Sequence, residues 1–152
     1  MLFNFNPEKH KFFTPKYPDK YVGKNVNKIV CRSSWEFKFC NWLDLNVNVM
    51  EWASECLKIP YYDPIKRKKR NYIPDFFMSI RNKNNELERF IIEIKPHNQS
   101  VKPRNSKNKT QARLIEENAI FLNNQAKWNS AKAYCEKYGL KFKVLTEKEL
   151  FK

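Results

Sequence analysis

The chain has 152 residues, of which 41% are apolar and 15% aromatic, so it can form one globular domain with a buried core and is not a disordered chain. Lys and Arg number 30 against 16 Asp and Glu, and the formal net charge of +14 favours a polyanionic partner, most simply nucleic acid, over a merely basic soluble protein. No long apolar run is present and the N-terminus lacks the apolar segment of a signal peptide, so we expect no membrane partner.

The first part of the chain is rich in Lys, Pro and aromatic residues and has little periodicity. We therefore predict an extended N-terminal arm over residues 1–28, followed by a single domain over residues 29–152. The aromatic side chains of the arm either pack on the body of the protein or stack on bases, and packing is the more economical interpretation. A short strand is predicted over residues 28–31.

The first helix is predicted to begin at Ser33. The spacing from Ser33 to Glu36 is that of a capping box, in which a Ser and a Glu satisfy backbone N–H groups at a helix start. Apolar side chains, including Phe39 and Leu43, then recur at helical spacing and predict a buried face. Glu36 consequently has two interpretations, as a capping residue or as a residue of a functional site.

Short strands are predicted over residues 49–53 and 56–62, and two buried strands over residues 72–77 and 90–95. A run of cations precedes the first buried strand and is expected at a hairpin tip, where it favours phosphate contact over a merely solvated loop. These cations are Lys66, Arg67, Lys68, Lys69 and Arg70.

Residues 97–109 are polar and contain no acidic residue, so we expect a mobile basic loop that grips a nucleic-acid backbone. The cations of this loop are Lys102, Arg104, Lys107 and Lys109. Residues 110–138 have a helical pattern, either as one long helix or as two helices broken at Asn123 and Asn124. A last strand over residues 141–145 and a terminal helical turn complete an α/β or α+β fold, a mixed β-sheet flanked by helices.

Ionisable residues lie where apolar strands should carry none. Asp75 falls in the first buried strand, and Glu93 and Lys95 fall on one face of the second, because strand side chains alternate between faces. Burying such charges is costly unless they are paired or bind a metal ion. If the strands form a hairpin, Asp75 and Glu93 can approach a common Mg²⁺, Lys95 can serve the attacking water, and Glu36 is a candidate third carboxylate.

The residues Pro74-Asp75 and Glu93-Ile94-Lys95 resemble the motif of the PD-(D/E)xK nuclease superfamily. Nearly the whole chain resembles the family of tailed-phage head completion nucleases, and the helix glutamate, aspartate and lysine are arranged similarly to those of the TnsA-type transposon-end nucleases. The stretches that carry this resemblance are residues 13–16, 20–23, 32–39, 44–46, 51–55, 59–61, 72–76, 92–96, 124–128 and 145–147.

The resemblance implies a metal-dependent DNA endonuclease with a restriction-endonuclease-like core. In that pattern Glu36, Asp75 and Glu93 hold Mg²⁺, or Mn²⁺ in its place, as one ion or two, and Lys95 is the catalytic lysine; Glu55 matches without an evident role. The resemblance further implies processing of a DNA end during phage head completion, with portal or neck proteins as partners, in the host cytoplasm and at the head–neck region of the virion, and no small-molecule cofactor. Two alternatives remain: a non-catalytic DNA-binding structural protein of the virion neck, and a restriction or transposition nuclease.

Overall fold

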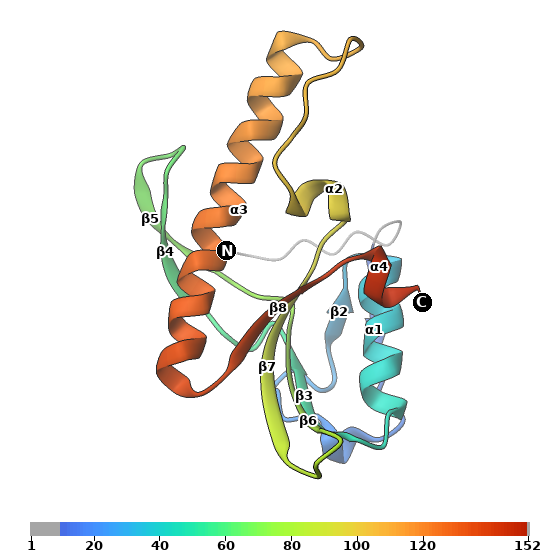
Figure 1. Cartoon of the computed structure of the whole chain (residues 1–152). Helices are drawn as coiled ribbons and strands as arrows, with labels where there is room; N and C mark the ends of the chain where they lie inside the picture. The colour runs from blue at the N-terminus through green and yellow to red at the C-terminus, as the bar shows by residue number, and fades with distance from the viewer. Residues whose placement is uncertain (1–9, 152) are drawn as a thin grey trace.

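The computed structural model describes residues 10–151, and the predicted arm therefore lies outside the described residues over positions 1–9. A four-stranded sheet forms the centre of the molecule (Figure 1). Its strands, in spatial order, are β3 (Val49–Ser54), β6 (Phe76–Arg81), β7 (Leu87–Ile94) and β8 (Lys141–Leu145). The strand β6 is antiparallel to both β3 and β7, whereas β8 runs parallel to β7, so the sheet is mixed, as predicted.

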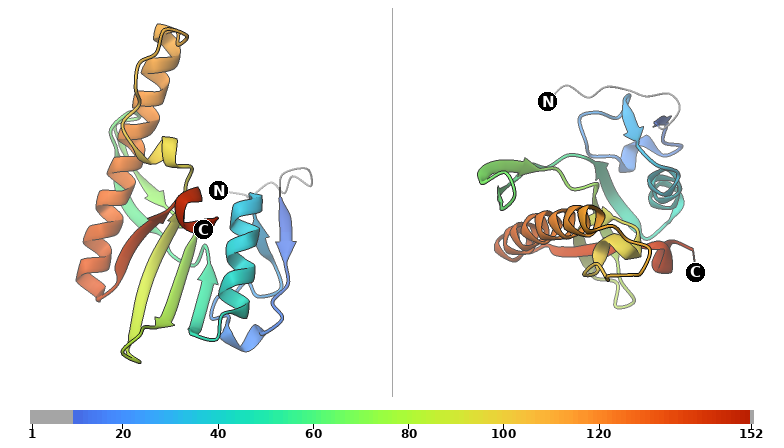
Figure 2. Two further views of the ribbon diagram at one scale, coloured as in Figure 1. Left: turned by 45° about the vertical axis from the view of Figure 1, so that its right-hand side comes forward. Right: turned by 90° about the horizontal axis from the view of Figure 1, so that it is seen from above.

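One helix covers each face of this sheet (Figure 2). The helix α1 (Ser34–Leu45) packs Phe39 and Leu43 against Trp52 and Ile92 in the larger core. The helix α3 (Gln111–Tyr138) buries Trp128 and Ala131 in a second core on the opposite face. The predicted fold class, a mixed sheet flanked by helices, is confirmed.

Residues 10–28 contribute to the same core as the residues that follow them. The strand β1 (Lys11–Phe13) pairs with β2 (Ile29–Cys31), and a 3-10 turn, η1 (Pro18–Lys20), lies between them. The rings of Phe13 and Tyr21 pack edge-on against Trp52, with centroids 5.8 and 4.7 Å away. The packing expected for the aromatic side chains is confirmed for these two, and the boundary expected after residue 28 does not separate two cores.

The strand predicted over residues 72–77 is wrong, because it joins the ends of two different strands. The hairpin of β4 (Ile59–Asp63) and β5 (Lys68–Tyr72) is a separate two-stranded sheet that packs along α3. The chain leaves this hairpin after Tyr72 and enters the central sheet at Phe76. Pro74 lies in the segment between β5 and β6, where no strand pairing requires the backbone N–H that proline lacks. A hairpin is therefore inserted in the sequence between the neighbouring strands β3 and β6.

The second half of the chain contains one long helix, which was one of the two predicted alternatives; the other was a pair of helices. Thr110 caps α3 by accepting a hydrogen bond from the N–H of Arg113, and Gly139 ends the helix with a left-handed φ of 69°. Asn123 and Asn124 do not break it, and Asn124 is buried. The N-terminal half of α3 projects beyond the sheet (Figure 1), and no helix among residues 10–151 is long and apolar enough to span a membrane.

The remaining segments lie at the ends of the central elements. The predicted basic loop contains a short helix, α2 (His97–Ser100), which the sequence did not indicate. The final turn, α4 (Glu147–Leu150), has the predicted capping box between Thr146 and Glu149.

Candidate active site

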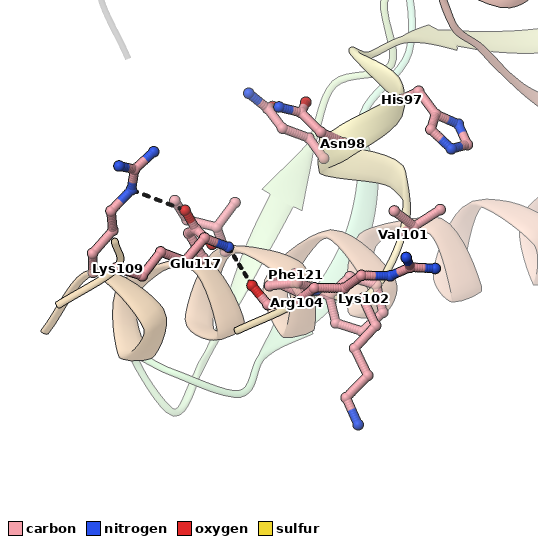
Figure 3. A pocket seen from close by; sticks show the side chains of 12 residues that line it. His97, Asn98, Val101, Lys102, Arg104, Lys109, Glu117 and Phe121 are labelled. Atoms are coloured by element: carbon pink, nitrogen blue, oxygen red, sulfur yellow. Dashed lines mark hydrogen bonds and ion pairs between the residues drawn. The ribbon is translucent and has the colours of Figure 1, made fainter. Parts of the chain in front are cut away.

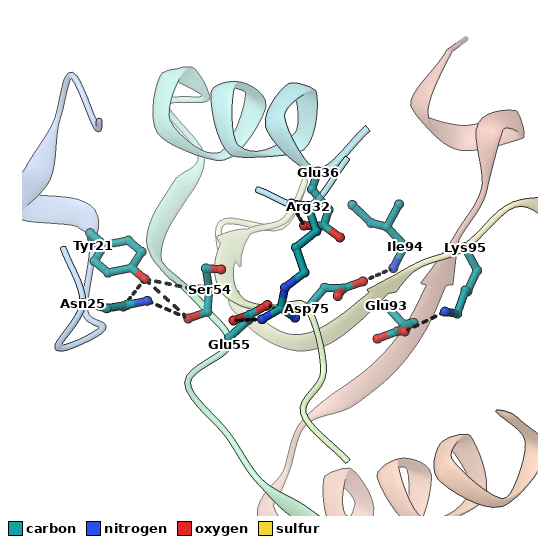
Figure 4. A network of polar contacts seen from close by, with 10 residues as sticks. All are labelled: Tyr21, Asn25, Arg32, Glu36, Ser54, Glu55, Asp75, Glu93, Ile94 and Lys95. Atoms are coloured by element: carbon teal, nitrogen blue, oxygen red, sulfur yellow. Dashed lines mark hydrogen bonds and ion pairs between the residues drawn. The ribbon is translucent and has the colours of Figure 1, made fainter. Parts of the chain in front are cut away.

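Asp75 lies just before β6, opposite Glu93. The two strands pair with Phe76 facing Ile92, so the residue before Phe76 falls across from the residue after Ile92. Asp75 is held from two sides: its Oδ2 accepts a hydrogen bond from the N–H of Ile94 at 2.8 Å, and its backbone carbonyl accepts one from the N–H of Glu55 at 3.0 Å (Figure 4). The expected approach of the two carboxylates across a hairpin is thus present, with Asp75 at the end of its strand.

Glu93 is buried near the end of β7 and has two polar neighbours. Its Oε2 accepts a hydrogen bond from the Tyr72 hydroxyl at 2.6 Å, and its Oε1 lies 3.8 Å from Nζ of Lys95. The prediction that Glu93 and Lys95 share a face of the strand is confirmed. Tyr72 comes from the hairpin β4–β5, which therefore supports the central sheet at this point.

Glu36 lies in the first turn of α1 and forms half of the expected capping box, because its carboxylate accepts from the N–H of Arg32 and not from that of the cap residue Ser33. Its N–H donates to Oγ of Ser33 at 3.1 Å, while its Oε2 accepts from the N–H of Arg32 at 2.8 Å. The guanidinium of Arg32 in turn pairs with the Glu55 carboxylate at 2.7 Å (Figure 4). Glu36 therefore stabilises the start of α1, and its charge also acts on Asp75. A capping role and a role in the site are thus compatible.

The three carboxylates sit in an environment that disfavours their charged forms. Burial raises the pKa of Asp75 well above its usual range, and the charges of Glu93 and Glu36 raise it further. Burial also raises the pKa of Glu93, against the hydrogen bond from Tyr72 and the charge of Lys95, and raises the pKa of Glu36, against the N–H of Arg32. Such mutually perturbed acids are typical of functional sites and leave the cluster short of positive charge.

The chemistry of these donors suits a hard divalent cation, although they do not form a ready-made cage. Among residues 10–151, no group of three or more His, Cys, Asp or Glu stands close enough together to hold a metal ion. Glu36 comes from the helix on one face of the sheet, whereas Glu93 points to the other face, toward Tyr72 and α3. Mg²⁺ usually takes only one or two carboxylates, with water and phosphate completing its shell, so the opposed Asp75 and Glu93 fit this requirement. The three-carboxylate ligand set stays a prediction.

The predicted basic tract extends beyond the hairpin tip. Lys66 and Arg67 lie in the turn between β4 and β5, but the three cations after them belong to strand β5, so the predicted tip was too long. Arg70 pairs with the buried Asp63 at 3.2 Å. The cations of the tract that are exposed to solvent are Lys66, Arg67, Lys68 and Lys69.

The segment after β7 lies against α3 and lines a cavity of about 1020 Å³ (Figure 3). Lys102, Arg104 and Lys107 are exposed there. Lys109 instead makes an ion pair with Glu117 of α3 at 2.7 Å, so it secures the segment to the helix. This internal pair makes Lys109 the least available of the predicted phosphate contacts.

Sequence reasoning missed Tyr72, Arg32 and Lys127 as neighbours of the site. The sequence indicates Tyr72 only as an apolar strand residue, whereas the hydrogen bond from its hydroxyl to Glu93 joins two separate sheets. Lys127 lies on α3 and interacts electrostatically with Glu93 and Lys95. The only signal for Lys127 was its position beside the inward-facing Trp128, which is weak because adjacent helical residues point about 100° apart.

A mixed sheet between helices, with opposed carboxylates and a lysine at the ends of adjacent strands, defines the chain as a nuclease of the PD-(D/E)xK kind. A family model described as "TnsA-like endonuclease N terminal" matches residues 46–147, and the chain belongs to this family of endonucleases. The head completion nuclease of Enterobacteria phage T4 is 37% identical to it over 141 residues, which cover 86% of this chain and 91% of the relative. The predicted resemblance and the nuclease class are confirmed. The family match includes Asp75, Glu93 and Lys95, whereas Glu36 precedes it.

Proposed function

We propose that this endonuclease is Mg²⁺-dependent, hydrolyses phosphodiester bonds of DNA, and processes DNA ends during phage head completion. The observation that carries the proposal is that Asp75, just before β6, lies across from Glu93 near the end of β7, with Lys95 beside Glu93. A protein that only bound DNA would gain nothing from buried carboxylates facing a phosphate, because like charges repel.

Each residue of the site has a distinct role in this proposal. Asp75 and Glu93 would hold the ion, with Glu36 as the candidate third ligand from α1, and Mn²⁺ could replace Mg²⁺ because both prefer oxygen ligands. When bound, the ion supplies Lewis-acid polarisation of the phosphate and lowers the pKa of a water molecule. Lys95 orients or deprotonates the attacking water, or stabilises the charge that develops on the phosphoryl oxygens.

Two supporting residues keep these groups in place. The Tyr72 hydroxyl holds one oxygen of Glu93 and so leaves the other, near Lys95, facing the site. The N–H of Ile94 holds one oxygen of Asp75 in the same way. Each carboxylate is thus oriented by one hydrogen bond before any ligand arrives, which reduces the cost of ordering it.

The DNA backbone contacts the exposed cations of the hairpin and of the segment after β7. Contacts of this kind position a duplex without reading its sequence, which suits the processing of an end of arbitrary sequence. The candidate contacts are Lys66, Arg67, Lys68, Lys69, Lys102, Arg104 and Lys107. The name of the phage T4 relative supports a role in head completion, and we extend it to portal or neck partners, first in the host cytoplasm and then at the head–neck region.

The test is incubation of supercoiled plasmid with the wild-type protein in Mg²⁺ and in EDTA, beside the variants Asp75→Ala and Lys95→Ala. Lys132→Ala is the matched control, because Lys132 is an exposed lysine on α3. We expect nicked or linear DNA only from wild type and Lys132→Ala, and only with the metal. Equal DNA binding by all forms without cleavage by any would contradict the proposal and support a non-catalytic DNA-binding protein.

A further inference from the structure

Lys127 is a cation beside the proposed site that forms no ion pair with any of residues 10–151. It lies in the middle of α3, next to the buried Trp128, and its side chain reaches toward the hairpin β4–β5. Its Nζ stands 5.9 Å from the ring centroids of both Tyr61 and Tyr72. The aromatic faces attract the ammonium but do not neutralise it.

The other cations near Lys127 are each balanced by an acid. Arg70 pairs with Asp63 at 3.2 Å, and Lys95 lies 3.8 Å from Glu93. The ammonium of Lys127 makes no ion pair or hydrogen bond with another side chain among residues 10–151, although the charges of Glu93 and Asp63 act on it. Burial lowers its pKa and the charge of Lys95 adds to this effect, while the charges of Glu93 and Asp63 offset it only in part, so the half-buried ammonium is destabilised where it stands. An unpartnered cation of this kind is costly to the fold and is best explained by an anion that arrives from outside.

Tyr72 ties Lys127 to the carboxylates. The ammonium lies near the ring of the same tyrosine whose hydroxyl donates to Glu93 at 2.6 Å. An anion at Lys127 is therefore adjacent to the Asp75–Glu93 pair. We propose that Lys127 binds a phosphate of the DNA backbone next to the carboxylate pair, as a phosphate-binding residue supplied by α3. This inference rests on the proposed function and names a contact to the backbone, not to a base.

The decisive measurement is binding of a short DNA duplex in EDTA, where no cleavage occurs, as a function of salt concentration. Lys127→Met keeps the methylene stem against the tyrosine rings and removes the charge, and Lys132→Met is the control on the exposed side of the same helix. The loss of one phosphate contact reduces the slope of log K against log salt by about 0.9, and we expect this for Lys127→Met alone. We expect its affinity at low salt to fall by about 10-fold, and Lys127→Arg to retain wild-type binding.

A second measurement uses the wild-type protein and does not depend on the folding of a variant. Lysine acetylation is followed by mass spectrometry with and without the duplex, and we expect the DNA to protect Lys127 and to leave Lys132 reactive. Equal salt slopes for the two methionine variants, or no protection of Lys127, would overturn the inference. Failure of the wild type to cut plasmid in Mg²⁺ would refute the proposed function instead, because neither binding measurement requires cleavage.

Discussion

The backbone N–H of Ile94 donates a hydrogen bond to Oδ2 of Asp75 at 2.8 Å, and this bond joins the acid that precedes β6 to the strand that carries Glu93 and Lys95. Ile94 stands between those two residues in the sequence, and its N–H points toward Asp75. Three ionisable groups from two segments are thereby fixed relative to one another by one backbone donor. The arrangement costs stability, because the buried carboxylates repel, and this cost has measurable consequences.

We predict that the protein without metal is more stable at about pH 5 than at about pH 7.5. Burial and mutual repulsion raise the pKa of Asp75, Glu93 and Glu36 above the value of about 4 that carboxyl groups have in an unfolded chain. Between that value and the raised folded values, the folded state binds more protons than the unfolded state. The free energy of unfolding therefore falls as the pH rises through this window, and urea unfolding in EDTA measures it.

The variant Asp75→Asn is the control for this effect. Its amide oxygen can still accept the hydrogen bond from Ile94, but it removes one of the repelling charges. The pH dependence of its unfolding should be flatter than that of the wild type, with stability at neutral pH equal or higher, while cleavage in Mg²⁺ is lost. An unchanged pH dependence would show that Asp75 is not destabilised by its neighbours.

We predict that Tyr72→Phe reduces cleavage without unfolding the protein. The ring stays in the core between the hairpin and α3, but Glu93 loses the 2.6 Å hydrogen bond that favours its charged form, so its pKa rises further. We expect a rate loss of about 10-fold at neutral pH, of the size seen when a group that orients a metal ligand is removed. Single-turnover cleavage should show a larger deficit at acidic pH than at alkaline pH; an equal deficit at every pH would indicate that the hydroxyl acts otherwise than through Glu93.

The sequence predicted the parts of the site that depend on local pattern. Alternation along β7 places Glu93 beside Lys95, and cap spacing places Glu36 at the start of α1, because both are fixed within a few residues. The apolar run over residues 72–77 gave no sign that the chain passes from the hairpin β4–β5 to the central sheet. Tyr72 and Phe76 are both buried, and they differ only in the strands with which they pair. Periodicity reports burial and does not report which element does the burying.

Contacts between distant segments had no local signal. Arg32 and Glu55 are 23 residues apart, and their ion pair joins the start of α1 to the end of β3. Glu55 also adopts a positive φ of 52°, which a glutamate rarely takes, so its conformation is a product of tertiary packing. The role of Lys127 likewise depends on the hairpin lying along α3.

The exposed hairpin cations and Lys109 should behave differently when neutralised. Lys68 and Lys69 have exposed side chains, so the double change to Gln should reduce the salt slope of DNA binding by about 2 and leave the melting temperature unchanged. Lys109→Gln should have the opposite profile, because Lys109 pairs with Glu117: unchanged DNA binding and a loss of stability of about 1 kcal/mol or less. Binding that depends on Lys109 as strongly as on the hairpin would show that its ion pair opens to admit DNA.

The pair of Arg32 and Glu55 provides a test of whether Glu36 takes part in the reaction. The charge of Arg32 lowers the pKa of Glu36 and the charge of Glu55 raises it. Arg32→Gln should therefore shift the acidic limb of the pH–rate profile to higher pH, Glu55→Gln should shift it to lower pH, and the double variant should restore an intermediate profile. The partly exposed pair contributes about 1 kcal/mol or less to stability, so the melting temperatures should change little. Superimposable pH–rate profiles for all four proteins would show that the ionisation of Glu36 does not govern cleavage and would leave it the capping role alone.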